Sequence, residues 1–267
     1  MNNKQRPIGI FDSGIGGLTV LKKLNKILPK EEFIYFGDTA HVPYGNKSKK
    51  TIIRYCKQIV SFLESKNVKL IIVACNTASS TALEILQRTN NIPIIDVVAP
   101  CIKKATQITQ NNKIGIIGTK TTIDSGKYQN EIKKTNNKIQ IYSQACPLLV
   151  PIIEEALFNH NITKEAINIY LSKMKADIDT LILGCTHYPL IKNLISKSIK
   201  NNIFIVDSSI ETAKYVKKYL IQNQLLSNKL VVETNKFYVS DDPKKFSLTA
   251  KLLLNENLNN IKSLELE

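Results

Sequence analysis

Two cysteines occupy matching places in the sequence. Cys75 follows the apolar run at residues 70–74, Cys185 follows a similar run at residues 181–184, and a polar segment typical of a helix start comes after each. Both thiols are therefore expected at the carboxyl ends of buried strands, where sites form in open α/β sheets. A helix N-terminus favours an anion, which predicts a lowered pKa and a reactive thiolate. A buried structural cysteine is the ordinary alternative for one such residue, but the equivalent second placement favours chemistry at both.

Polar groups near the two thiols could hold a small zwitterion or move its protons. Asp12 and Ser13 lie in the glycine-rich segment at residues 11–17, where glycines allow a ligand close to the backbone and a helix N-terminus attracts a carboxylate. His187 comes two residues after Cys185, which favours a role in proton transfer. Helix capping by Asp12 and an exposed cap-region position for His187 are the alternatives. A nucleotide-binding loop has weak support, since the segment is not G-x-G-x-x-G and no P-loop lysine follows.

Short apolar, β-branched runs alternate with longer segments of helical period. This alternation is typical of a parallel sheet covered by helices on both faces, so the predicted fold class is α/β. The predicted strands are residues 8–11, 33–36, 70–74, 113–117, 180–183, 203–206 and, near the end of the chain, 231–239. The predicted helices are residues 18–28, 48–65, 77–87, 125–135, 151–158, 164–175, 190–198, 213–222 and 242–254.

The two halves of the chain resemble each other. Three segments recur in the same order at offsets of 106, 110 and 111 residues: 8–10 at 114–116, 70–75 at 181–185, and 91–96 at 202–207. Such a nearly constant offset is expected if one domain was duplicated, although apolar strands also resemble one another by chance. The segment from residue 211 onward lies outside the repeat and must pack on one of the halves.

Composition and charge indicate a folded globular protein. The 267 residues are 43% hydrophobic and 22% charged. The formal net charge is +15, but the lysines are dispersed along the chain and only three arginines occur, so nucleic-acid binding is not expected. No secretory signal precedes the first apolar run, and no apolar run has the length of a membrane span, which predicts a cytoplasmic protein without a membrane partner.

The cysteine count argues against cross-links. The chain has five cysteines with no C-x-x-C pair, so neither a disulfide framework nor a zinc cluster is expected, and no metal site is predicted. Cys56, Cys101 and Cys146 are predicted to be buried structural residues. No lysine motif of the pyridoxal-phosphate kind is found, which predicts chemistry without a cofactor.

Four blocks of the sequence are similar to motifs of bacterial glutamate racemases. They are GIFDSGIGGLTV at residues 9–20, YFGDTAHVPYG at 35–45, ACNTAS at 74–79 and LGCTHYPL at 183–190. At residues 238–243 the chain reads YVSDDP, which departs from the family's usual Thr-Gly-Asp. The resemblance implies two similar parallel-sheet α/β domains in a pseudo-symmetric arrangement, with the active site between them. It also implies that the C-terminal segment returns to the first domain, so the expected domains are residues 1–97 plus 208–267 and residues 98–207.

The same resemblance implies cofactor-independent interconversion of L-glutamate and D-glutamate, with Cys75 acting on the D-enantiomer and Cys185 on the L-enantiomer. Racemisation removes the α-proton from one face and returns a proton to the other, a task that suits two thiols on facing domains. Assistance is expected from Asp12 at Cys75, and from Glu154 with His187 at Cys185. The substrate-binding residues that the resemblance implies are Asp12, Ser13, Tyr44, Gly45, Asn76, Thr77, Thr119, Thr122, Thr186 and His187.

Further expectations follow from the resemblance, and alternatives stay open. The family supplies D-glutamate for peptidoglycan, and hence for cell-wall biogenesis and cell shape, and a homodimer is expected. A racemase for aspartate or another small amino acid would use the same paired thiols with a different pocket. A cysteine hydrolase would leave the second thiol unexplained. A nucleic-acid-binding or gyrase-binding protein would account for the basic charge alone.

Overall fold

The apolar runs of the first half, together with two strands from the C-terminal segment, form a parallel sheet with strand order β10-β9-β2-β1-β3-β4. A computed structural model gives this fold and describes residues 3–172, 174, 177–199, 202–231 and 233–266. The strands are β1 (Ile8–Asp12), β2 (Phe33–Gly37), β3 (Leu70–Val73), β4 (Ile94–Asp96), β9 (Lys236–Val239) and β10 (Ile261–Ser263). Because alternate side chains of a strand point to opposite faces, Ile8 and Ile10 enter the core on one side of this sheet and Phe11 enters the core on the other.

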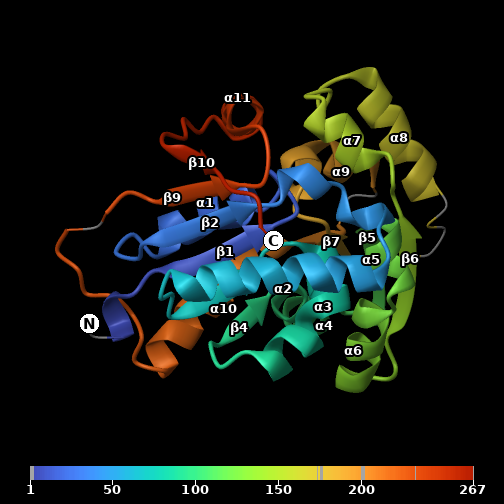
Figure 1. The fold of residues 1–267 in the computed structure, drawn as a ribbon. Coiled ribbons are helices and arrows are strands. Elements are labelled where there is room, and N and C mark those ends of the chain that lie inside the picture. Colours follow the sequence, from blue (N-terminus) through green and yellow to red (C-terminus); the bar gives the residue numbers. More distant parts are fainter. Residues whose placement is uncertain (1–2, 173, 175–176, 200–201, 232, 267) are drawn as a thin grey trace.

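A second parallel sheet, with strand order β6-β5-β7-β8, lies beside the first (Figure 1). Its strands are β5 (Lys113–Gly118), β6 (Gln140–Ala145), β7 (Thr180–Gly184) and β8 (Phe204–Asp207). The order corresponds to β2-β1-β3-β4 in the first sheet, and the repeated segments fall on the matching strands β1 and β5, β3 and β7, and β4 and β8. The predicted fold class, α/β with two similar parallel-sheet domains, is confirmed.

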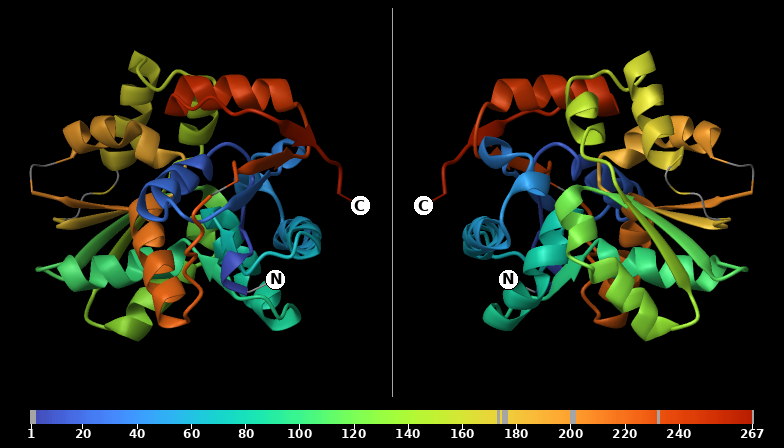
Figure 2. Two further views of the ribbon diagram at one scale, coloured as in Figure 1. Left: turned by 90° about the vertical axis from the view of Figure 1, so that its left-hand side faces the viewer. Right: turned by 90° about the vertical axis from the view of Figure 1, so that its right-hand side faces the viewer.

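Helices cover both faces of each sheet (Figures 1 and 2). On the first sheet, α1, α10 and α11 pack on one face and α2 and α3 on the other; on the second, α7, α8 and α9 face α4 and α6 across the strands. The helices are α1 (Leu18–Ile27), α2 (Lys49–Ser65), α3 (Asn76–Thr89), α4 (Val98–Ile108), α5 (Lys120–Asp124), α6 (Lys127–Thr135), α7 (Leu149–Glu154), α8 (Asn161–Ser172), α9 (Lys192–Ser198), α10 (Ser208–Gln222) and α11 (Pro243–Leu254). Short 3-10 helices are η1 (Asn3–Gln5), η2 (Thr39–His41), η3 (Tyr44–Asn46) and η4 (Tyr188–Ile191).

Several element predictions were wrong or incomplete. The predicted strand at 231–239 is limited to β9, and its residue 232 lies outside the described residues, as do residues 173 and 175 of the helix predicted at 164–175. The helix predicted at 151–158 begins earlier and ends at Glu154, because Ala156 adopts a left-handed backbone with φ of 57°. β6 was missed because an edge strand with half-exposed side chains has no apolar run to reveal it. α4 and β10 were not predicted either.

The C-terminal segment adds β9 and β10 to the edge of the first sheet, next to β2. Figure 2 shows this segment lying along the N-terminal strands, with α11 reaching toward the helices of the second domain. The boundaries at residues 97 and 208 remain a prediction.

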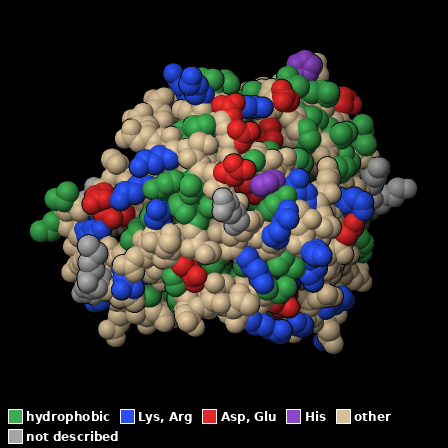
Figure 3. Space-filling model, viewed as in Figure 1, with side chains coloured by type: hydrophobic (Ala, Val, Ile, Leu, Met, Phe, Trp, Pro, Cys, Tyr) green, Lys and Arg blue, Asp and Glu red, His purple; other side chains and the backbone are tan. Residues whose placement is uncertain are grey.

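The surface carries dispersed basic charge. Figure 3 shows Lys and Arg side chains scattered over one face of the molecule, with acidic side chains among them. Within the described part of the chain, no helix combines the length and the apolar character needed to cross a bilayer.

Candidate active site

The carboxyl ends of three strands meet between the two sheets. β1 ends at Asp12, and the chain places Cys75 just beyond β3 and Cys185 just beyond β7. Both cysteines are 5% exposed, and both line one narrow cavity of about 40 Å³. The cavity between the domains is thus small and closed, with a thiol contributed by each domain.

Most residues predicted from the sequence line this cavity. They are Ser13, Tyr44, Gly45, Cys75, Asn76, Thr77, Thr119, Cys185, Thr186 and His187. Three predicted residues, Asp12, Thr122 and Glu154, lie behind the lining and contact residues of the cavity wall. The sequence analysis missed other lining residues: Val42, Pro43, Asn46, Lys120, Pro147, Val150 and Pro151. Val42 and Pro43 belong to the second sequence block, whereas no pattern marked residues 147–150.

Cys75 is surrounded by neutral hydrogen-bonding groups. It caps α3, where the Ala78 amide donates to its sulfur at 3.5 Å, and its thiol lies 3.7 Å from the Ser13 hydroxyl. Burial, followed by the charge of Asp12, raises the pKa of Cys75 to about 12. The predicted lowering of this pKa is therefore wrong, because removal of the sulfur from water outweighs the α3 amide and the Ser13 hydroxyl. Cys75 is a protonated thiol at neutral pH.

Cys185 lies against an ion pair. Its sulfur is 3.7 Å from Nδ1 of His187, and Nε2 of that ring is 3.0 Å from Oε1 of Glu154 in α7. Burial lowers the pKa of His187, but its contacts with Cys185 and Glu154 outweigh burial and hold the pKa well above the ordinary histidine value. A positive charge on the His187 ring stabilises negative charge on the neighbouring sulfur.

The turn after Cys185 differs from the predicted helix start. Tyr188 begins the 3-10 helix η4, and α9 follows only at Lys192, so Cys185 does not cap an α-helix as Cys75 does. Pro189 occupies the beginning of η4, where its lack of an amide proton is tolerated.

Glu154 connects the cavity wall to a second hollow. Its side chain is 25% exposed, and it lines a hollow of about 260 Å³ together with Glu155, Asp241 and Asp242. The chain of contacts Cys185, His187, Glu154 therefore runs from the narrow cavity toward solvent.

Asp12 joins the two domains behind the cavity. One carboxylate oxygen accepts the Gly14 amide at 3.0 Å, and the other accepts the Thr186 hydroxyl of the second domain at 3.3 Å. The carboxyl is fully buried, and burial raises its pKa.

Gly16 and Gly17 allow the side chains of Thr186 and Asp12 to lie close to the backbone of the first loop. A Cβ at Gly16 would lie 2.4 Å from Oγ1 of Thr186, and a Cβ at Gly17 would lie 2.5 Å from Cβ of Asp12. Neither position has room for a side chain, which explains the glycines of the first sequence block.

Hydroxyl groups from both domains form one corner of the site. The side chains of Thr77, Thr119 and Thr122 lie within 2.9–3.2 Å of one another, and Thr121 donates to the Gly45 carbonyl at 2.7 Å. A Cβ at Gly45 would lie 2.9 Å from Cβ of Thr119. This corner therefore presents hydroxyl groups that can bind a carboxylate.

Asp38 orients Tyr44 at the cavity wall. The Tyr44 hydroxyl donates to Oδ2 of Asp38 at 2.5 Å, while Oδ1 of the same carboxylate accepts from Ser240 and contacts His41. Asp38 was not singled out in the sequence, although it lies in the second sequence block.

Similarity to known proteins agrees with this geometry. A model of the Asp/Glu/Hydantoin racemase family matches residues 8–216. The glutamate racemase of Geobacter metallireducens is 44% identical over 263 residues, covering 98% of this chain and 97% of that protein.

Two crystal structures are similar along nearly their whole length. Glutamate racemase isoform RacE1 from Bacillus anthracis superposes with a TM-score of 0.95 at 34% identity, covering 98% of each chain. The glutamate racemase of Francisella tularensis in complex with D-glutamate gives a TM-score of 0.93 at 40% identity, covering 99% of each chain.

Proposed function

We propose, because this chain belongs to the Asp/Glu/Hydantoin racemase family, that it interconverts L-glutamate and D-glutamate with Cys75 and Cys185 as two opposed acid–base groups. One observation carries the proposal: a buried thiol from each domain lines the same narrow cavity. The relatives named glutamate racemase, which match nearly the full chain, support glutamate as the substrate.

The unlike surroundings of the two sulfurs support a direction for each proton. In the reaction of L-glutamate, the Cys185 thiolate accepts the α-proton, which leaves the bonding electron pair on the α-carbon. The Cys75 thiol then donates its proton to the opposite face and becomes the thiolate. The contact of His187 with Cys185 and the burial that keeps Cys75 protonated support this assignment. In the reaction of D-glutamate the roles are reversed: Cys75 acts as the thiolate and Cys185 as the thiol.

Binding groups are available for the carboxylates and for the developing negative charge. The start of α3 presents backbone amides and the positive end of the helix dipole to the cavity. We assign the hydroxyls of Ser13, Thr77, Thr119 and Thr186 to substrate binding, with Asn76 beside them. Fixed donors of this kind stabilise a carbanion whose charge spreads into the adjacent carboxylate.

The cellular role follows from the proposed reaction. We propose that the product D-glutamate is used for peptidoglycan, that the protein acts in the cytoplasm, and that it forms a homodimer. Sedimentation of the purified protein tests the dimer, and rescue of a D-glutamate-requiring bacterial strain tests the cellular role.

Proton exchange with solvent tests the reaction itself. The pure protein, without added cofactor, is incubated with L-glutamate in deuterated water, and the products are followed by chiral chromatography and mass spectrometry. D-glutamate carrying one α-deuterium is expected, because the returned proton comes from a thiol that exchanges with solvent. Unchanged L-glutamate would reject glutamate as substrate, and conversion of aspartate in a parallel reaction would support the alternative racemase. If neither amino acid reacts, salt-dependent DNA binding is measured as the remaining hypothesis.

A further inference from the structure

A buried tyrosine of the second domain contacts the residue that follows Cys75. Tyr128, the second residue of α6, is fully buried, and its hydroxyl donates to Oδ1 of Asn76 in α3 at 2.6 Å. Cys101 of α4 lies near the same hydroxyl.

This contact fixes the orientation of the Asn76 amide. Asn76 lines the cavity and is 2% exposed. Its Oδ1 is held by Tyr128, while its Nδ2 is buried without a hydrogen-bond partner among the described residues. An unpaired buried donor is costly unless a ligand satisfies it, and a substrate carboxylate is an acceptor of the right kind.

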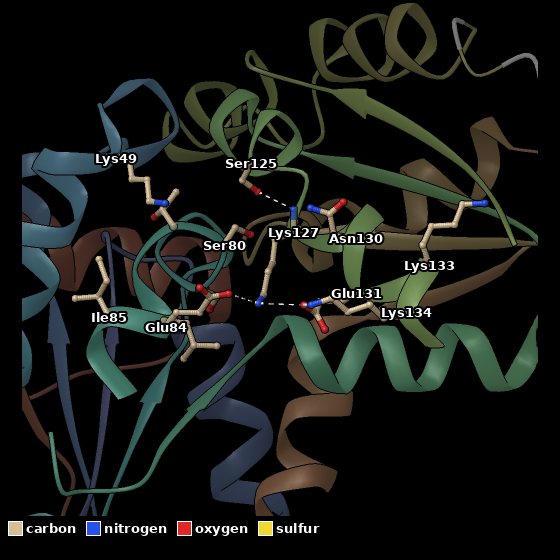
Figure 4. A pocket seen from close by; sticks show the side chains of 13 residues that line it. Lys49, Ser80, Glu84, Ile85, Ser125, Lys127, Asn130, Glu131, Lys133 and Lys134 are labelled. Atoms are coloured by element: carbon tan, nitrogen blue, oxygen red, sulfur yellow. Dashed lines mark hydrogen bonds and ion pairs between the residues drawn. The ribbon is translucent and has the colours of Figure 1, made fainter. Parts of the chain in front are cut away.

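An ion pair nearer the surface also connects α3 and α6. The ammonium of Lys127, the residue before Tyr128, lies 3.3 Å from Glu84 of α3 and 3.4 Å from Glu131 of α6 (Figure 4). Glu84 is largely exposed, so this ion pair contributes little to stability. The buried hydroxyl, in contrast, acts directly on a residue of the cavity.

We infer that Tyr128 is a positioning residue for substrate binding: from the second domain, its hydroxyl turns the Asn76 amide so that Nδ2 donates to a substrate carboxylate beside Cys75. The inference rests on the proposed function for its substrate. With this role for Tyr128, the orientation of Asn76 in the first domain depends on its contact with α6 of the second domain. Glutamate therefore binds tightly only when the two domains are packed so that this contact forms.

Tyr128→Phe tests this role with the loss of one oxygen atom. The KM for each glutamate enantiomer is expected to rise about tenfold, with kcat changed less than about twofold, because the lost interaction is made with the carboxylate in both ground and transition states. In an Asn76→Ala background, the same substitution is expected to leave KM unchanged, since Tyr128 acts only through Asn76. An unchanged KM in the single variant, or equal effects in both backgrounds, overturns the inference.

Tyr170→Phe is the matched control. Tyr170 is a buried tyrosine of α8 whose hydroxyl accepts the Leu148 amide at 3.2 Å, so its loss costs a comparable hydrogen bond away from Asn76. Its KM is expected to match that of the wild type, and an equal rise in KM would mean that Tyr128 has only a structural role. Melting temperatures of all variants are measured in parallel.

Asn76→Asp provides a second test that leaves Tyr128 intact. The carboxylate still accepts from Tyr128 but lacks the donor toward the cavity, so a KM increase of about tenfold or more is expected. Because a buried carboxylate also destabilises the fold, KM is measured well below the melting temperature of the variant. A KM equal to that of the wild type shows that Nδ2 does not face substrate and overturns the inference. Activity of the wild-type protein in the same assay separates these outcomes from a failure of the proposed function.

Discussion

The two halves of the site have the same placement of sulfur but different partners for it. Cys75 and Cys185 follow equivalent strands, β3 and β7, and are equally buried. Around Cys75 the contacts are the Ser13 hydroxyl and an α3 amide, whereas Cys185 contacts the imidazole of an ion pair. The repeated fold sets where each thiol lies, and the surrounding loops and helices set the groups that contact each sulfur.

The difference teaches why a pseudo-symmetric site can be chemically asymmetric. A racemase needs one acid and one base at any moment, so two identical half-sites would compete for the same protonation state. Burial next to Asp12 favours the neutral thiol at Cys75, whereas Cys185 lies beside the His187–Glu154 pair. Four changes test this comparison.

The largest effect is expected from removing either thiol. Cys75→Ser and Cys185→Ser should each lower racemisation in both directions by at least about a thousandfold, because each turnover uses one sulfur as base and the other as acid. Chiral chromatography of both reactions measures the loss. Full activity in either variant would mean that the two thiols are not partners. Cys56→Ser, at a buried cysteine that does not line the cavity, is the control and should remain active.

His187→Asn should reduce kcat/KM about a hundredfold, since the Cys185 thiolate loses its cationic neighbour. The two enantiomers are equally stable in water, so kcat/KM must fall equally in both directions. The step at Cys185 then becomes limiting, and α-deuterated L-glutamate should show a larger primary isotope effect than α-deuterated D-glutamate. Equal isotope effects would contradict the assignment of His187 to Cys185 alone.

Glu154→Gln should give a smaller loss, about tenfold, together with a change in pH dependence. Glu154 helps to raise the pKa of His187, so its neutralisation lowers that pKa, and the alkaline decline in rate should move to lower pH. The ion pair stabilises the fold fully below the unfolded histidine pKa of about 6.5, and this contribution is lost as the pH rises through the folded value. Rate profiles and urea unfolding at several pH values measure both effects. Glu155→Gln, at the neighbouring position, should change neither.

Asp12→Asn should produce the smallest effect, a severalfold increase in the alkylation rate of Cys75 in the free protein. The wild-type thiol has a pKa of about 12, so its rate with iodoacetamide should still rise with pH between about 8 and 10, where an ordinary thiol reaches a plateau. Removing the Asp12 charge lowers the pKa of Cys75 and increases the thiolate fraction. Peptide mass spectrometry of the labelled site measures the rate. A wild-type plateau near pH 9 would contradict the protonated state of Cys75.

Local patterns in the sequence determined a large part of the architecture. Short apolar, β-branched runs and the segments of helical period between them predicted the α/β class, and the repeat placed Cys75 and Cys185 just after corresponding strands. These features are readable because strand and helix periodicity depend on neighbouring residues. The sequence also identified Gly16 and Gly17 as part of a glycine-rich segment, although only the structure shows which atoms exclude a side chain there.

Tertiary structure alone decided the pKa of Cys75 and the contacts behind the cavity lining. The sequence predicted a lowered pKa for Cys75 from its helix, but the degree of burial reversed the sign. Tyr128 reaches Asn76 across 52 residues, and nothing in either local sequence indicates the contact. Burial and long-range contacts depend on the whole packed molecule. Residue types and spacing could therefore place the two sulfurs at strand ends, whereas only packing of the two domains could set the surroundings of each sulfur.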